Sequence, residues 1–235
     1  MNISASYYSD IGGRDKNEDT VSMMESGKTV LAMVADGLGG HMAGEVASAM
    51  AVNAVNSALA GQRISVVTLR NAVENANQEV WQMHGTNGMK TTLSALWFDD
   101  HAALAANVGD TRIYQFRSGK LIFQSRDHSV AQLAVNAGDI CAEEIRTSKE
   151  RHQLTRALGA RDEVSVDISH LELQKGDALL LCSDGFWEKI HETEMTYDLA
   201  GAETAGAWME NMRCRLAKRG VETGDNHSAV AMIMK

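Results

Sequence analysis

Short apolar runs of five to eight residues recur along the chain and are rich in Val, Ile, Leu and Ala. Runs of this length and composition predict buried β-strands. Two polar links, Asp99–His101 and Ser118–Gly119, each join two neighbouring runs and therefore predict β-hairpins. The predicted strands are Thr29–Ala35, Thr91–Phe98, Ala102–Val108, Arg112–Phe116, Lys120–Gln124, Ala178–Cys182 and Ser228–Met234.

Three longer segments repeat apolar residues every three or four positions, which is the period of an amphipathic α-helix. They cover residues 66–83, Gly44–Leu59 and about 203–218. Because the predicted strands form antiparallel groups with helices between the groups, the pattern favours an α+β fold. We find no repeat, low-complexity segment or linker, so the sequence predicts a single domain over residues 1–235.

The segment from about 127 to 160 has a different character, because it is polar and carries only two short helical patterns, near 130–135 and 142–145. Long excursions from a compact domain are often functional. We therefore expect a surface segment with a role beside the active site.

The chain is acidic, with a formal net charge of −9 over 235 residues. An acidic surface argues against nucleic acid or an anionic membrane as the main partner. No apolar stretch has the length of a membrane span, and the N-terminal residues lack the pattern of a secretory signal. The three cysteines, Cys141, Cys182 and Cys214, lie far apart and form no metal-binding pair, which favours a reducing cytoplasm.

Aspartates stand at the ends of three predicted strands, in Asp36-Gly37, Asp184-Gly185 and Gly224-Asp225. A carboxylate at the end of a buried strand is held rigidly, and glycine allows the backbone to approach a ligand. Together the three carboxylates would offer hard oxygen ligands, which select Mg²⁺ or Mn²⁺. Each dipeptide alone is more simply a turn.

Two further polar motifs have plain interpretations when taken singly. The stretch Arg14–Asp19 is a charged loop, although an arginine beside a metal pair can grip phosphate oxygens bidentately. The stretch around Asp110 is an acidic hairpin turn.

Taken together and in this order, the motifs resemble those of the metal-dependent PP2C-type protein serine/threonine phosphatases, in their compact bacterial form. The matching motifs span nearly the whole chain, from about residue 6 to residue 233. They are Arg14-x-x-Asn17-Glu18-Asp19, Asp36-Gly37-Leu38-Gly39-Gly40-His41-x-x-Gly44-Glu45, Thr91-Thr92, Val108-Gly109-Asp110-Thr111-Arg112, Arg126-Asp127-His128-Ser129, Leu154-Thr155-Arg156-Ala157-Leu158-Gly159, Ser183-Asp184-Gly185 and Gly224-Asp225-Asn226.

The resemblance implies a four-layer α-β-β-α sandwich with two antiparallel sheets. It also implies two bound Mn²⁺ or Mg²⁺ ions, with a third in bacterial members. The cation pair would activate a water molecule, and this water would attack phosphorus. In this chain Asp36 would bridge the pair, the Gly37 carbonyl would bind one ion, and Asp184 and Asp225 would bind the other. Glu18 would hold a metal-bound water, Arg14 the substrate phosphate, and Asp110 the third cation. Residues 127–160 would be the flap beside the active site.

The proton donor to the leaving group stays open. Animal members carry a histidine directly after the first Asp-Gly, where this chain has Leu38; His41 and a metal-bound water are the two candidates. We expect His128 to be structural. The flap also departs from the bacterial pattern, with Ser148–Arg151 where a His-Pro pair is common.

The resemblance implies that the substrates are phosphorylated proteins, among them a bacterial serine/threonine kinase and its targets. We expect the chain itself to be a monomer. A catalytically weak binding or regulatory module is the alternative, but it predicts loss of a metal carboxylate, and all are present. A sigma-factor phosphatase would carry regulatory domains for which this chain has no room. A nuclease would carry a basic stripe.

Overall fold

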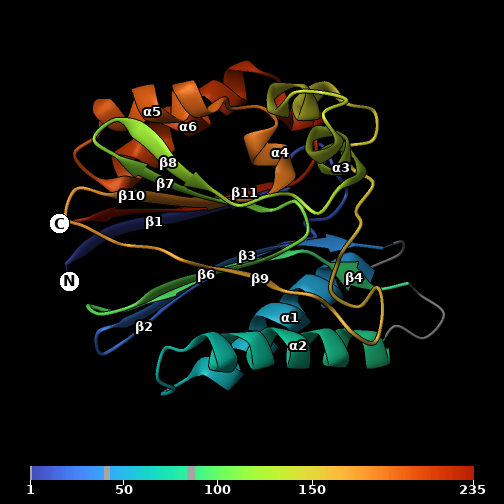
Figure 1. Ribbon diagram of the computed structural model, residues 1–235. Coiled ribbons are helices and arrows are strands. Elements are labelled where there is room, and N and C mark those ends of the chain that lie inside the picture. Colours follow the sequence, from blue (N-terminus) through green and yellow to red (C-terminus); the bar gives the residue numbers. More distant parts are fainter. Residues whose placement is uncertain (1, 40–42, 84–87) are drawn as a thin grey trace.

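The computed structural model describes residues 2–39, 43–83 and 88–235, and it stacks them in four layers (Figure 1). Two sheets lie face to face in the middle, and helices cover both outer faces. All paired strands run antiparallel. The predicted sandwich of two antiparallel sheets between helices is therefore confirmed.

Each sheet combines strands that are distant in sequence. The first has the order β1 (Ile3–Asp10), β11 (His227–Met234), β10 (Ala178–Cys182), β7 (Arg112–Arg117), β8 (Lys120–Gln124). The second has the order β2 (Asp19–Ser26), β3 (Thr29–Leu38), β5 (Leu93–Phe98), β6 (Ala103–Val108), β9 (Asp167–His170), and β4 (Lys90–Thr91) pairs with β3. Both predicted hairpins are present, as β5–β6 and β7–β8.

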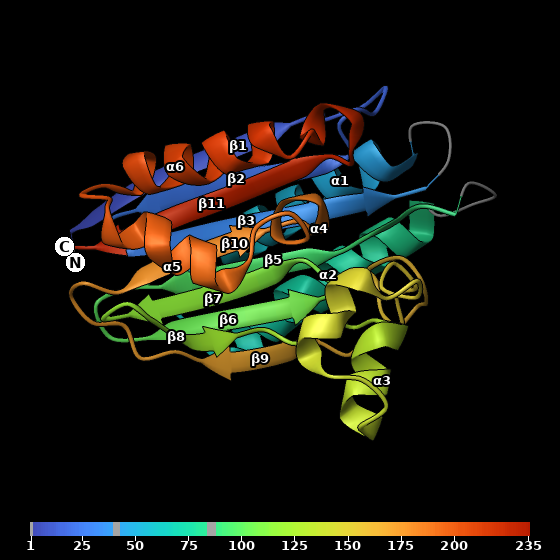
Figure 2. The ribbon, with the colours of Figure 1, turned by 90° about the horizontal axis from the view of Figure 1, so that it is seen from above.

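The helices complete the layers. Helices α1 (Ala43–Leu59) and α2 (Val66–Met83) cover the second sheet, and α5 (Glu192–Ala200) and α6 (Ala205–Lys218) cover the first (Figure 2). A short helix, α4 (Asp184–Trp187), follows β10, and a 3₁₀ turn, η2 (Val221–Thr223), precedes β11. Within the described ranges, no helix is long and apolar enough to cross a membrane.

The central strands are buried on both faces, which explains their continuous apolar sequence. In β3, Val30, Ala32 and Val34 face the other sheet, whereas the alternating Leu31 and Met33 pack on α1 and α2. Burial between the sheets and beneath each helical layer thus forms three apolar clusters. This rigid arrangement fixes the positions at which the strands end.

The structure also corrects several expectations. Strands β1, β2 and β9 and helices α4 and α5 were not predicted, because they are short or carry many polar side chains. Strand β8 was expected to be buried, but it lies at the sheet edge with Leu121 and Ile122 exposed. Met83, at the end of the apolar stripe of α2, is also exposed.

Residues 127–160, which we call the flap, contain α3 (Val130–Ala137) and the 3₁₀ helix η1 (Ala142–Thr147). Ser129 caps α3 by accepting a hydrogen bond from the Gln132 amide, and Gly138 ends it with φ +82°. Isolated bridges Ser129–Leu154 and Thr91–Leu158 attach the flap to itself and to β4. Figures 1 and 2 place it at one end of the sandwich.

Candidate metal centre

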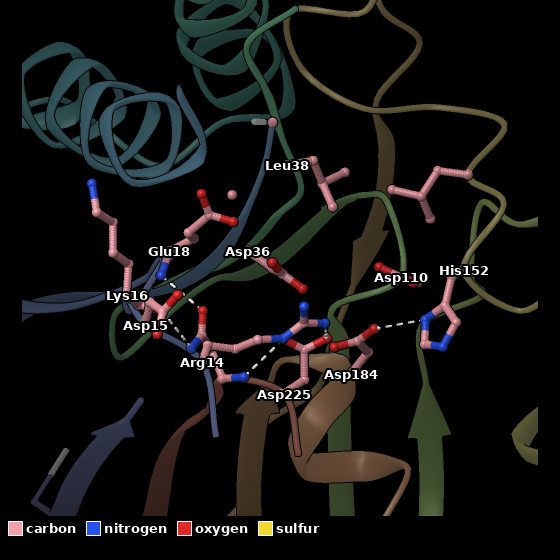
Figure 3. Close-up of a pocket in the computed structure, with 14 residues that line it drawn as sticks. Arg14, Asp15, Lys16, Glu18, Asp36, Leu38, Asp110, His152, Asp184 and Asp225 are labelled. Atoms are coloured by element: carbon pink, nitrogen blue, oxygen red, sulfur yellow. Dashed lines mark hydrogen bonds and ion pairs between the residues drawn. The ribbon is translucent and has the colours of Figure 1, made fainter. Parts of the chain in front are cut away.

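A pocket of about 710 Å³ opens at one end of the sandwich, and acidic side chains from several strand ends line it (Figure 3). All seven candidate residues border this single pocket, although they come from segments more than 200 positions apart. These residues are Arg14, Glu18, Asp36, Gly37, Asp110, Asp184 and Asp225.

Asp36 is held at the end of β3 by main-chain hydrogen bonds to the Thr91-Thr92 motif. Its amide donates to Thr92 Oγ1 at 2.9 Å, and its carbonyl accepts from the Thr92 amide at 2.8 Å. The Thr91 hydroxyl donates to the same carbonyl at 2.9 Å. These bonds immobilise the backbone and leave the Asp36 carboxylate directed into the pocket.

Asn226 connects the first motif to the last. Its side-chain amide donates to the carbonyls of Ile11 and Lys16 at 2.8 and 2.9 Å, and its Oδ1 accepts from the Glu18 amide at 2.8 Å. The loop that carries Arg14 is thereby fixed beside Asp225. The sequence placed Asn226 in a motif but gave no reason for it.

Arg14 lies at the rim of the pocket with 60% of its side chain exposed. Its Nε and Nη2 donate to the two carboxylate oxygens of Asp225 at 2.9 and 2.7 Å. The guanidinium thus sits beside a candidate metal ligand, in a bidentate geometry that would equally suit a phosphate.

Asp184 and Asp110 lie on the other side of the pocket. Asp184 begins α4, and the indole nitrogen of Trp187, at the end of that helix, donates to the Asp110 carbonyl at 2.9 Å. Asp184 and Asp110 are 7% and 5% exposed, so both carboxylates are largely removed from solvent.

Crowding of buried carboxylates changes their acidity. Burial, together with the negative charges of Asp19 and Asp184, raises the pKa of Asp36 well above its usual range. Burial and the charge of Asp184 do the same for the pKa of Asp110. A cluster that disfavours its own ionisation fits cations that would offset the repulsion, and an all-oxygen donor set fits Mg²⁺ or Mn²⁺.

Asp19 belongs to this cluster, although the sequence did not mark it as a site residue. It lies opposite Asp36 in the β2–β3 ladder, and burial raises its pKa to about 7. The Ser183 hydroxyl donates to Oδ2 at 2.7 Å, whereas the buried Oδ1 has no partner within the described residues. An unpaired buried oxygen beside Asp36 is a further sign of a ligand or its water.

Glu18 points toward the start of α1, where the Gly44 amide hydrogen-bonds its carboxylate. Burial raises the pKa of Glu18. A Cβ built on Gly44 would lie 2.6 Å from the Glu18 carboxylate and 2.8 Å from the Gly37 carbonyl. Glycine at position 44 is therefore required for Glu18 and Gly37 to share one wall of the pocket.

The two histidines considered from the sequence have different outcomes. His128 is buried. Its Nδ1 accepts a hydrogen bond from the Gly109 amide at 3.1 Å, and its Nε2 lies 3.2 Å from Asp167 Oδ2. These contacts agree with a structural role. His41 lies outside the described residues, so its candidacy as proton donor stays a prediction.

Comparisons with known proteins agree with this geometry. Residues 8–221 match the family described as protein phosphatase 2C. The serine/threonine phosphatase stp of Listeria monocytogenes is 35% identical over 203 residues, which cover 81% of this chain and 80% of that protein.

Solved structures share the whole fold. The serine/threonine phosphatase of S. agalactiae superposes with a TM-score of 0.89 and 26% identity, covering 100% of both chains. The catalytic domain of the phosphatase PstP, in complex with two manganese ions, gives a TM-score of 0.83 and 30% identity, covering 98% of this chain and 97% of that one. The chain belongs to the protein phosphatase 2C family of metal-dependent serine/threonine phosphatases.

Proposed function

We propose that the chain hydrolyses phosphoserine and phosphothreonine in proteins with two divalent cations, Mn²⁺ or Mg²⁺, held by Asp36, Asp184, Asp225 and the Gly37 carbonyl. The observation that carries the proposal is the convergence of these groups on one pocket, in which burial and neighbouring negative charges raise the pKa of Asp36. The chemistry that such cations supply is activation of a water and neutralisation of phosphate charge.

The chain's own residues position the reaction. The Thr91-Thr92 motif fixes Asp36, which would bridge the pair, and Asn226 fixes the loop that carries Arg14. The guanidinium of Arg14 would exchange its pairing with Asp225 for the equatorial oxygens of the substrate phosphate. Glu18 would hold a water through its carboxylate, and the proton donor remains His41 or a water.

The finer assignments extend the proposal on the composition of the chain and its resemblance to the compact bacterial members of the family. We place the chain in the cytoplasm as a monomeric catalytic domain over residues 1–235, opposing a bacterial serine/threonine kinase and its targets. Asp110 would take part in binding a third cation, because it borders the pocket beside Asp184.

Hydrolysis of a phosphothreonine peptide should require Mn²⁺ and should stop in EDTA. Asp184→Asn should reduce turnover by about 10²-fold or more, since the variant loses a charged ligand of the cations that activate the water and neutralise the phosphate charge. Release of inorganic phosphate measures the rate in each case.

Asp162→Asn provides the matched control, because Asp162 is exposed and lies outside the pocket. It should hydrolyse the peptide at the rate of the unmodified chain. Equal hydrolysis with Mn²⁺, with EDTA and by Asp184→Asn would show that the two-cation assignment is wrong.

Gly44→Ala should lower turnover by about tenfold to 10²-fold, because the new methyl group displaces the Glu18 carboxylate or the Gly37 carbonyl. It should also destabilise the fold by about 1–3 kcal/mol, as overpacking does. Gly206→Ala, in α6, is the control: the nearest atom to its added methyl group is Thr204 Oγ1 at 3.9 Å. Unchanged turnover by Gly44→Ala would rule out a role for this wall of the pocket.

A further inference from the structure

Two leucines differ from everything else that lines the pocket. Leu38, at the end of β3, and Leu154, in the flap, are the only apolar side chains that border it among the described residues, since the others are polar or glycine. Figure 3 shows Leu38 and Arg14 on opposite sides of Asp36. The pocket therefore has a charged side, to which the phosphate is assigned, and a side with apolar surface.

Neither leucine contributes to the core. Leu38 and Leu154 are only partly buried, and neither belongs to the three apolar clusters that the described residues form between the sheets and beneath the helices. Apolar surface that stays in contact with water is stabilised when a ligand covers it, and ligand pockets typically combine such surface with a few polar groups. The apolar surface of the two leucines is thus available to a ligand.

Main-chain pairing holds both leucines in place. Leu38 pairs with Lys90 in the β3–β4 ladder. Leu154 forms an isolated bridge with Ser129, and the carbonyl before it and the amide after it are also hydrogen-bonded within the flap. A contact surface on a fixed backbone loses little conformational entropy when it binds, so it can discriminate between side chains.

The pocket has room for more than a phosphorylated side chain. Its volume of about 710 Å³ is that of a site for a drug-sized ligand. The flap brings one other residue to it, His152, whose Nδ1 lies 3.3 Å from Asp184 Oδ2. Because a leucine has no charge and no proton to donate, Leu38 and Leu154 can act on a substrate only through apolar contact.

We propose that Leu38 and Leu154 form an apolar subsite for the side chain next to the phosphorylated residue, so that phosphoproteins with Leu, Met or Phe at that position are preferred. The subsite is continuous with the pocket that holds the phosphate, and its occupant is therefore part of the same substrate. The inference rests on the proposed function. It gives the flap a part in substrate choice that does not involve the cations.

The test compares phosphothreonine peptides that differ only in the residue directly before or directly after phosphothreonine, which is either Leu or Ser. For the unmodified chain with Mn²⁺, Leu at one of these positions should raise kcat/KM by about tenfold over Ser, mainly through a lower KM. Leu154→Ser and Leu38→Ser should each remove most of this preference. Leu154→Ser should keep kcat/KM for the Ser peptide within about twofold of the unmodified chain, and Leu154→Met should retain the preference.

Leu133→Ser is the matched control, because Leu133 lies in α3 of the same flap, is 55% exposed and does not border the pocket. It should keep the full preference. Equal kcat/KM for the Leu and Ser peptides, or a preference that survives in both Leu154→Ser and Leu38→Ser, would overturn the inference while Mn²⁺-dependent hydrolysis upheld the proposed function. So would an equal loss for both peptides in Leu154→Ser, which would show a structural role instead. Failure to hydrolyse any peptide with Mn²⁺ would count against the proposed function, and the inference would fall with it.

Discussion

Asp36→Asn should reduce hydrolysis of a phosphothreonine peptide by about 10³-fold or more, the largest loss expected for any single carboxylate of the pocket. Asp36 is the residue assigned to both cations, and its backbone is held by three hydrogen bonds, so a neighbouring residue cannot take its place. The amide keeps the shape of the side chain but removes its charge. Phosphate release under saturating Mn²⁺ measures the loss.

A second readout distinguishes loss of a ligand from loss of the fold. Because burial and the charges of Asp19 and Asp184 raise the pKa of Asp36, its ionised form destabilises the metal-free pocket. In EDTA, Asp36→Asn should therefore resist urea at least as well as the unmodified chain, whereas Mn²⁺ should stabilise only the latter. Turnover near the unmodified rate, or an Mn²⁺ stabilisation equal to that of the unmodified chain, would contradict the bridging role.

The sequence predicted those strands whose burial produces a local run of apolar residues. Strands β3, β5 and β10 lie between other layers and therefore read as continuous apolar runs. Strand β1 lies at a sheet edge with most of its side chains partly or fully exposed, so its sequence has no such run. Edge position is a property of the assembled sheet, which local pattern does not record.

The same distinction separates the site residues that could be predicted from those that could not. Asp36, Asp184 and Asp225 each adjoin an apolar strand, so the sequence marked them. Asp19 joins the cluster through its register opposite Asp36, and His152 through the placement of the flap on α4. The first depends on the register of the β2–β3 hairpin and the second on the packing of the flap beside α4, and the motifs alone reveal neither.

Arg112→Met should destabilise the fold by about 3–5 kcal/mol, because it leaves the Asp127 carboxylate buried without its cation. The two side chains are 4% and 1% exposed, and they pair through bonds of 2.8 and 2.7 Å. The guanidinium also lies 3.5 Å from the centre of the Trp187 ring, and that indole holds the Asp110 carbonyl. Urea unfolding in EDTA measures the loss without contributions from bound cations.

The double variant Arg112→Met/Asp127→Leu identifies the cause. If the cost comes from the unpaired charge, replacing both partners by apolar residues should recover most of the urea midpoint, because no buried carboxylate remains. Lys28→Met, at the exposed Lys28–Asp100 pair, should leave the midpoint nearly unchanged. A double variant as unstable as Arg112→Met alone would show that the stability comes from Arg112 packing on Trp187 rather than from its pairing with Asp127.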